Sequence, residues 1–176
     1  LIGLIEAAGE ALAQVGVRRL VLSNSHGGNR HVLETAGLRL RDELGMLVVH
    51  ASWFRFPRPE HVDLPEGEWR HGLHGGAVET AMMMHLRADL VRGLQSAQAH
   101  SLGQELEETL RRVGPEGAAS FSWLAGDLNP GGAVGDATLA DGDMGARLVS
   151  HYGTVLAEVI EDVRAFPLDR LAEDAT

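Results

Sequence analysis

Apolar residues recur at helical spacing at the start of the chain, which predicts a helix over about residues 2–14 that Gly16 ends. The next run, 17–22, is short and nearly continuous in apolar residues, as is typical of a buried parallel strand. The apolar positions of the helix are Ile5, Ala8, Leu12 and Val15.

The same order of helix and strand is then repeated. Asn29 is a good N-cap for a second helix, whose apolar positions again fit a period near 3.6 residues and which Gly45 ends. A second apolar run at 46–51 predicts the next strand. This alternation predicts an α/β fold with a doubly wound, mainly parallel sheet.

The middle and the end of the chain are less regular. Residues 53 to about 75 show no periodicity, and a structureless segment of this length inside a compact domain is usually functional. Beyond it the pattern predicts helices, a short strand and a loop. The helices are 78–90, 95–112 and 144–163, the strand is 118–124, and the loop is 126–132. We place a single domain at 1–166 and a frayed polar tail at 167–176.

Composition excludes several classes of function. The chain has 25 acidic residues and 15 basic ones, all arginine, and its net charge of −10 argues against a nucleic-acid surface. The absence of lysine excludes Schiff-base chemistry, and the absence of cysteine excludes thiolate metal sites and cysteine nucleophiles. No run approaches the roughly 20 apolar residues of a membrane span, and no signal peptide is evident. We therefore expect a cytoplasmic protein with no membrane partner.

Two histidines set among paired glycines are the main candidates for chemistry. His26 lies in SNSHGGN at 23–29, directly after the first predicted strand, and His74 lies in HGLHGGAVET at 71–80. Glycines allow the backbone to approach a ligand closely, and imidazole is the commonest metal ligand. The pair therefore indicates a metal-dependent hydrolytic site. Two plainer interpretations remain: His26 bonds its own turn, and Glu79 is a first-turn carboxylate stabilised by the helix dipole.

Three segments resemble signatures of the creatininase (creatinine amidohydrolase) family. NSHGGN at 24–29 is similar to that family's Asn-Gly-His-Gly-Gly-Asn, and HGGAVETAMM at 74–83 to its His-Ala/Gly-Gly-x-x-Glu-Thr-Ser-Leu-Met. GDATLA at 135–140 resembles a later Gly-Asp-Pro-x-Ala-x-Ala segment. The three segments occur in the family's order, and the likeness covers nearly the whole chain.

The resemblance implies a three-layer α/β/α sandwich, usually in a homo-oligomer. It also implies two divalent ions, zinc or manganese, which cleave a non-peptide or cyclic amide C–N bond through a metal-bound hydroxide. His26 and Glu79 align with metal ligands, and His74 aligns with a catalytic histidine that passes a proton to the leaving nitrogen.

A small-molecule amide is the expected substrate. Leu73 stands where creatininase itself has an acidic residue, which argues against creatinine. The residues expected to bind the substrate are Ser25, Gly75, Gly76 and Trp123.

The resemblance also leaves ligands unaccounted for. The family's Glu-x-His-Gly-x-His-Leu-Pro motif and a following Asp, which supply the other ligands, precede the first helix of this chain. We therefore expect the amino-terminal part to be absent, the site to be incomplete, and apolar strand surface to be exposed. Two alternatives stay open: a peptide-trimming or deformylating member of the family, and a non-catalytic fragment or scaffold.

Overall fold

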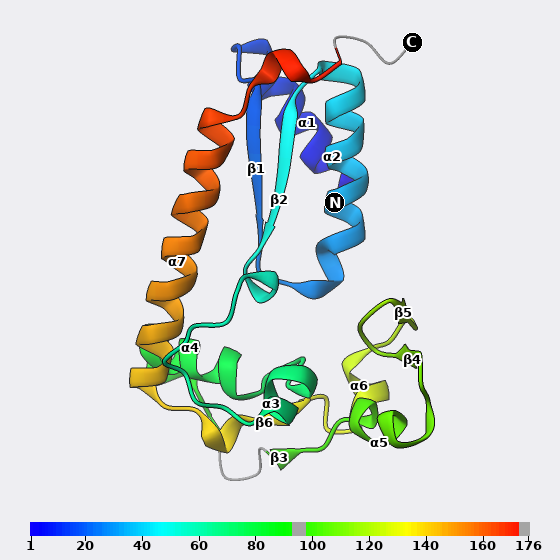
Figure 1. Ribbon diagram of the computed structural model, residues 1–176, viewed down its shortest axis with the longest axis vertical. Coiled ribbons are helices and arrows are strands. Elements are labelled where there is room, and N and C mark those ends of the chain that lie inside the picture. The colour runs from blue at the N-terminus through cyan, green and yellow to red at the C-terminus, as the bar shows by residue number, and fades with distance from the viewer. Residues whose placement is uncertain (93–97, 173–176) are drawn as a thin grey trace. The chain divides into compact units, whose positions relative to one another are not determined.

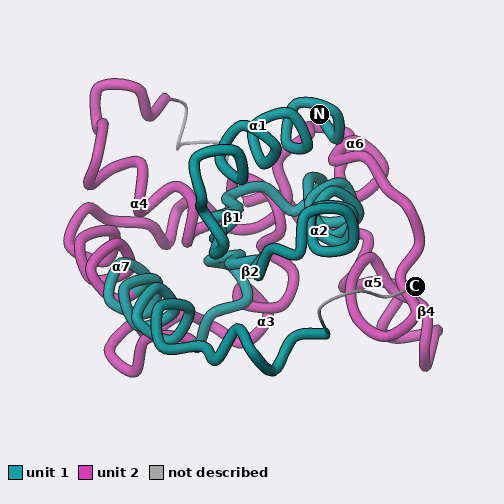
Figure 2. The backbone as a smooth tube through the Cα atoms, turned by 90° about the horizontal axis from the view of Figure 1, so that it is seen from above, with its two compact units in different colours: residues 1–57, 152–176 teal, residues 58–151 magenta. Residues whose placement is uncertain are grey.

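The computed structural model describes residues 1–92 and 98–172. The chain divides into two compact units, one of Leu1–Pro57 with Tyr152–Thr176 and one of Arg58–His151 (Figure 2). The long helix α7 (Gly142–Ala165) belongs to the second unit at its start and to the first at its end. The single domain expected over 1–166 stays a prediction.

The first unit is built on a two-stranded parallel sheet. Strand β1 (Arg19–Asn24) pairs with β2 (Leu47–Ser52), with Asn24 opposite Ser52. Helices α1 (Ile2–Gln14) and α2 (Arg30–Leu44) lie on one face of this pair, and the second half of α7 lies on the other (Figure 1). This layering of helix, sheet and helix confirms the α/β class.

Local sequence signals predict the ends of these helices well. Helix α1 has the predicted bounds, and Gly45 ends α2 in the left-handed conformation (φ +63°) that favours glycine. Asn29 occupies the N-cap position of α2, but its side chain makes no capping hydrogen bond, in contrast to the expectation from sequence. The buried core of this unit includes Ala36, Leu40, Met46, Leu47 and Ala51.

Two arginine side chains bond the segment after α7 to the rest of the first unit. The arginine side chain of Arg19 donates to the carbonyl of Phe166 at 3.0 Å, and Arg41 donates to the carbonyl of Ala172. The predicted tail therefore includes an ordered turn, while its residues 173–176 lie outside the described part. The short 3-10 helices are η1 (Gly27–Asn29), η2 (Trp53–Arg55) and η6 (Leu168–Arg170).

In its described part, the second unit combines short helices with three pairs or bridges of very short strands. Strand β3 pairs antiparallel with β6, β4 pairs parallel with β5, and His74 forms an isolated antiparallel bridge with Val134. The helices are α3 (Glu66–His71), α4 (Ala77–Arg87), η3 (Ala88–Leu90), α5 (Leu102–Thr109), α6 (Ala125–Leu128) and η5 (Ala137–Leu139). The strands are β3 (Gln98–Ala99), β4 (Val113–Gly114), β5 (Ala119–Ser120) and β6 (Gly135–Asp136).

Several predictions for this unit are wrong in extent. The strand expected at 118–124 is only β5, and the loop expected at 126–132 begins inside α6. The helix expected at 95–112 is α5 alone, because the Ser101 side chain caps its first turn, and 93–97 lie outside the described residues. None of the described helices is long and apolar enough to cross a membrane.

Candidate functional site

The loop that carries His26 is anchored at the carboxyl ends of β1 and β2. Asn24, only 3% exposed, accepts a hydrogen bond from the His26 backbone N–H at 3.1 Å and donates its amide to Ser52 Oγ at 3.3 Å. The His26 carbonyl in turn accepts from Asn29 N–H at 3.0 Å, which begins the turn into α2. The His26 backbone is therefore held to the sheet through its N–H and to the turn into α2 through its carbonyl.

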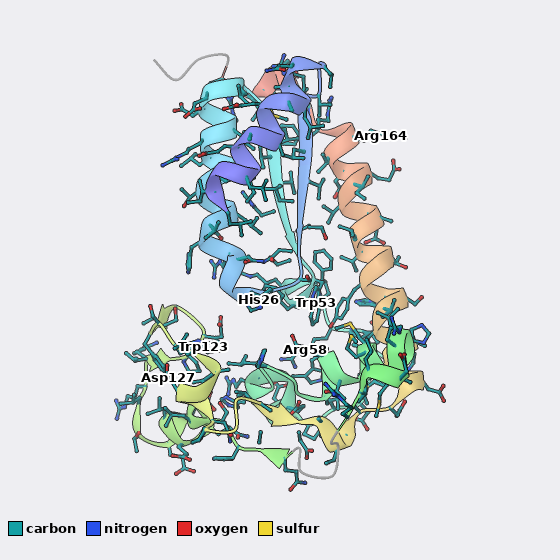
Figure 3. All side chains as sticks on the ribbon, turned by 180° about the vertical axis from the view of Figure 1, so that it is seen from behind. His26, Trp53, Arg58, Trp123, Asp127 and Arg164 are labelled. Carbon is teal, nitrogen blue, oxygen red and sulfur yellow. The ribbon has the colours of Figure 1, made fainter. Side chains whose placement is uncertain are left out.

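The His26 imidazole, labelled in Figure 3, is exposed and lies close to Gly28 of its own loop. A Cβ on Gly28 would come within 2.9 Å of the ring Nε2, so glycine at this position leaves room for the ring. Among residues 1–92 and 98–172, no hydrogen bond or ion pair engages the ring. The hydrogen bonds that hold His26 in its loop involve only its backbone, so the imidazole nitrogens are available to bind a ligand.

The second loop carries His74 and Glu79 at the start of α4. His74 and Val134 exchange both backbone hydrogen bonds, at 3.2 and 2.6 Å. Gly75 adopts φ +67° and donates its N–H to Glu79 Oε2 at 2.6 Å, while Thr80 donates its hydroxyl to the Gly75 carbonyl at 3.2 Å. One Glu79 oxygen thus accepts a hydrogen bond within the loop, as a first-turn carboxylate would. Among the described residues, none donates a hydrogen bond to the other oxygen.

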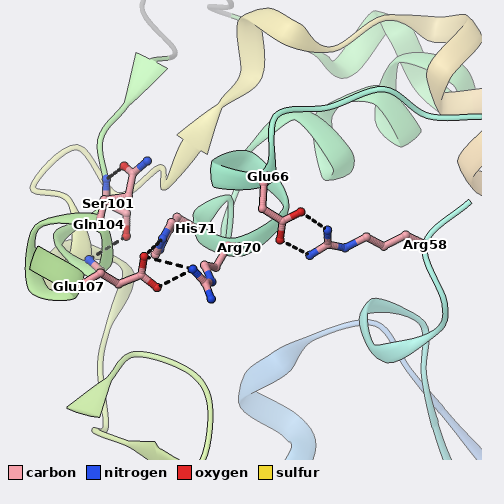
Figure 4. A network of polar contacts seen from close by, with 8 residues as sticks. Arg58, Glu66, Arg70, His71, Ser101, Gln104 and Glu107 are labelled. Carbon is pink, nitrogen blue, oxygen red and sulfur yellow. Dashed lines mark hydrogen bonds and ion pairs between the residues drawn. The ribbon is translucent and has the colours of Figure 1, made fainter. Parts of the chain in front are cut away.

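His71 and His74 have different environments although they stand three residues apart. His71 ends α3, is 7% exposed, and places Nε2 3.2 Å from Glu107 Oε2 of α5, where Arg70 also contacts the Glu107 carboxylate (Figure 4). His74 lies outside α3 and is exposed. His71 therefore joins α3 to α5, whereas the His74 side chain is exposed and its chemical role stays a prediction.

Glu68 is a buried carboxylate that the sequence pattern did not single out. It is 8% exposed, and its Oε1 and Oε2 accept the backbone N–H groups of Ala77 at 2.6 Å and Asp136 at 2.8 Å. A Cβ on Gly76 would overlap Glu68 Oε1. The glycine at 76 is therefore explained by an internal carboxylate, without any need for a ligand. The nearest sequence signal is the pair of glycines four residues apart, at 72 and 76.

The four residues expected to bind substrate lie in varied environments. Ser25 is exposed, Gly75 is half-buried and Gly76 is buried. Trp123, labelled in Figure 3, is half-buried. Its indole N–H donates to the Pro115 carbonyl at 2.9 Å. Their substrate-binding role stays a prediction.

A cavity of about 340 Å³ lies in the first unit beside the end of β2. Its walls include Ser52 and His50 of β2, Arg30 and Glu34 of α2, and Arg55. The hydrogen bond from Arg30 at 2.9 Å holds the pKa of Glu34 below its ordinary value, so this carboxylate stays ionised at neutral pH. The cavity shares Ser52 with the anchored His26 loop.

The two predicted metal ligands belong to different units: His26 lies in the first and Glu79 in the second. The predicted catalytic residue His74 also lies in the second unit. Their convergence in one coordination shell stays a prediction. Within the described residues, no three His, Asp or Glu side chains gather in a metal-binding arrangement.

Comparisons with known proteins bear on the whole chain. A family model described as creatininase, creatinine amidohydrolase, matches residues 1–160. Two solved structures are similar over most of this chain, while no curated protein matches. One is a Bacteroides fragilis protein provisionally assigned as a creatinine amidohydrolase, with 22% identity, a TM-score of 0.69, and coverage of 95% of this chain. The other is a tryptophan-to-phenylalanine mutant of creatininase, with 25% identity, a TM-score of 0.61, and coverage of 92% of this chain. This chain spans 62% of the length of each.

Proposed function

Because the chain belongs to the creatininase family, we propose that the protein is a metal-dependent amidohydrolase. It cleaves a non-peptide or cyclic amide C–N bond in a small molecule. The observation that carries the proposal is that backbone bonds hold the loops of His26 and His74 while both imidazoles remain exposed. A backbone that is already held limits the order that the loops must gain on binding, and an exposed imidazole is open to a ligand.

His26 and Glu79 are the residues that hold the divalent ions in this proposal. An imidazole nitrogen and a carboxylate oxygen suit zinc or manganese, and Glu79 has one oxygen beyond the one bonded to Gly75. When bound, the ions supply Lewis acidity toward the amide carbonyl and a nucleophile from water. His74 delivers a proton to the leaving nitrogen, which must be protonated before the C–N bond breaks.

The cavity beside β2 supports a small-molecule substrate. Its volume of about 340 Å³ falls in the range of ligand pockets, and its wall residue Ser52 is bonded to the residue that anchors the His26 loop. We propose that Ser25, Gly75, Gly76 and Trp123 also contact the substrate. The protein acts in the cytoplasm as a homo-oligomer in this proposal.

Metal analysis and a panel of amide substrates test the proposal. We expect the full-length protein to bind zinc or manganese, and Glu79→Gln to lower that affinity. His74→Ala should keep the metal and lose about 10²–10⁴-fold in hydrolysis, the usual contribution of a proton-transfer group. His31→Ala, an exposed histidine of α2, is the matched control and should change neither.

The same panel separates the alternatives. Hydrolysis confined to peptides or formamides would point to a peptide-trimming or deformylating enzyme. A protein that binds no divalent metal, or a His74→Ala variant with full activity and normal metal content, would contradict the proposed mechanism.

A further inference from the structure

We infer that Glu68 is the positioning residue for the loop that carries His74 and Glu79. This inference rests on the proposed function for what the loop does, and on the geometry of the second unit for how the loop is held. Glu68 itself is not a ligand candidate, because it is buried and each carboxylate oxygen already accepts a backbone N–H.

The first bond of Glu68 sets where α4 begins. Ala77 is the first residue of α4, and its N–H is one of the groups that a helix leaves without an intrahelical partner. The N-cap residue, Gly76, has no side chain to satisfy it, so a carboxylate nine residues upstream does so at 2.6 Å. Glu79 follows two residues later, and its carboxylate is bonded back to Gly75.

The second bond holds the segment opposite. Asp136 N–H donates to Glu68 Oε2 at 2.8 Å, and Val134, two residues earlier, pairs with His74 through both backbone bonds. One carboxylate therefore ties the helix that carries Glu79 to the segment that fixes the backbone of His74. No other described side chain bonds both segments.

Three glycines make room for this carboxylate. A Cβ on Gly72 or Gly76 would overlap Glu68 Oε1, and one on Gly135 would come within 2.8 Å of it. The three residues come from the end of α3, the start of α4 and β6, which are the segments that Glu68 joins. The packing thus leaves one position for the carboxylate and, through its two bonds, one position for the loop.

Amide signals in the NMR spectrum of the ¹⁵N-labelled chain test the inference directly. In the native chain we expect the amide protons of Gly75, Ala77 and Asp136 to be shifted downfield and protected from exchange, since each donates to a carboxylate. In Glu68→Gln we expect the Gly75 proton to move upfield and its protection to fall about tenfold or more, because the loop that aligns it with Glu79 is released.

The matched control is Glu66→Gln. Glu66 lies in the same helix and is exposed, and its carboxylate bonds the Arg58 side chain and no backbone group of the loop (Figure 4). It should leave the Gly75 amide unchanged. If Glu68→Gln does not fold, Glu68→Asp keeps the charge while shortening the reach, and the same upfield shift is expected. Unshifted, unprotected Ala77 and Asp136 amides in the native chain would overturn the inference, as would a folded Glu68 variant with a native Gly75 signal.

Addition of Mn²⁺ to the same samples connects positioning to the proposed site. Paramagnetic broadening should affect residues 75–80 of the native chain and of Glu66→Gln at the same concentration, while Glu68→Gln should require about tenfold more Mn²⁺. Absence of broadening in the native chain would count against the proposed function, and the amide shifts would still decide whether Glu68 positions the loop. Equal Mn²⁺ affinity in Glu68→Gln and Glu66→Gln would overturn the positioning role.

Discussion

Gly76→Ala tests whether glycine at 76 is required by the buried carboxylate of Glu68. The new Cβ would overlap Glu68 Oε1, whereas the backbone of Gly76 (φ −76°, ψ −165°) is open to any residue. Steric crowding is therefore the main cost in the folded state. We expect the free energy of unfolding to fall by about 2–3 kcal/mol, in the range of overpacked cores.

Removing the carboxylate should abolish most of that cost. Glu68→Ala alone leaves the N–H groups of Ala77 and Asp136 without their acceptor, a loss of about 3–6 kcal/mol at 1.5–3 kcal/mol for each bond to a charged group. In that background, the nearest of the contacts that remain to the substituted residue 76 are Gly72 Cα at 3.1 Å and Gly135 Cα at 3.4 Å. Its cost should fall below about 1 kcal/mol, which gives a coupling of roughly 1–2 kcal/mol.

Urea unfolding followed by tryptophan fluorescence measures the cycle. Trp53→Phe should serve as the common background, because Trp69 and Trp123 then report on the second unit alone. Glu68→Gln is the control for size: it keeps an atom of similar size near the new Cβ, so the cost of Gly76→Ala should fall less there than in Glu68→Ala. Gly126→Ala, which would meet nothing within 4 Å, is the control for adding a methyl group to this unit. An equal cost of Gly76→Ala in all three backgrounds would refute the steric argument.

Two further predictions follow from particular contacts. The Arg58 side chain holds the pKa of Glu66 below its ordinary value of 4.5. The contribution of this ion pair to stability is therefore complete above about pH 4.5 and is lost as the pH falls through the lowered pKa. Arg58→Met should raise the pKa of Glu66 in an NMR titration, and an unchanged pKa would contradict the assignment. Gly145→Ala should destabilise the second unit by about 3 kcal/mol or more in urea unfolding, because the new Cβ overlaps the carbonyl of Ala81, while Gly153→Ala in the same helix meets nothing within 4 Å and should be tolerated. A Gly145→Ala variant as stable as Gly153→Ala would refute the close helix contact.

The first unit could be predicted from sequence because its determinants are local. The apolar spacing gave the bounds of α1, and Gly45 ended α2 in the left-handed conformation that its position suggested. Strands β1 and β2 begin one or two residues later than their apolar runs, since strand bounds depend on which backbone groups find a partner across the sheet. Periodicity reports the face of an element more reliably than its ends.

The second unit was harder to predict because its elements are short and stabilised by distant contacts. The start of α5 did carry a local signal, the capping pair Ser101 and Gln104, which the wider helical pattern obscured. Glu68 carried no such signal, since its two partners lie nine and 68 residues away. A carboxylate whose bonds are this distant in sequence looks like any exposed glutamate until the backbone is in place.

The contacts of Glu68 change how the glycine-rich segment around His74 is interpreted. Glycine beside a candidate metal-binding residue suggests a backbone that approaches a bound molecule closely. For Gly75 the structure shows a related use of glycine: its positive φ lets its N–H donate to the Glu79 carboxylate. Gly76 serves another purpose, because the atom that approaches it is Glu68 Oε1 from within the same unit. The segment therefore combines two requirements in adjacent residues, one for presenting His74 and Glu79 and one for packing the carboxylate that positions them. A substitution at 76 should consequently act first on the stability of the loop, and on metal binding only through Glu79.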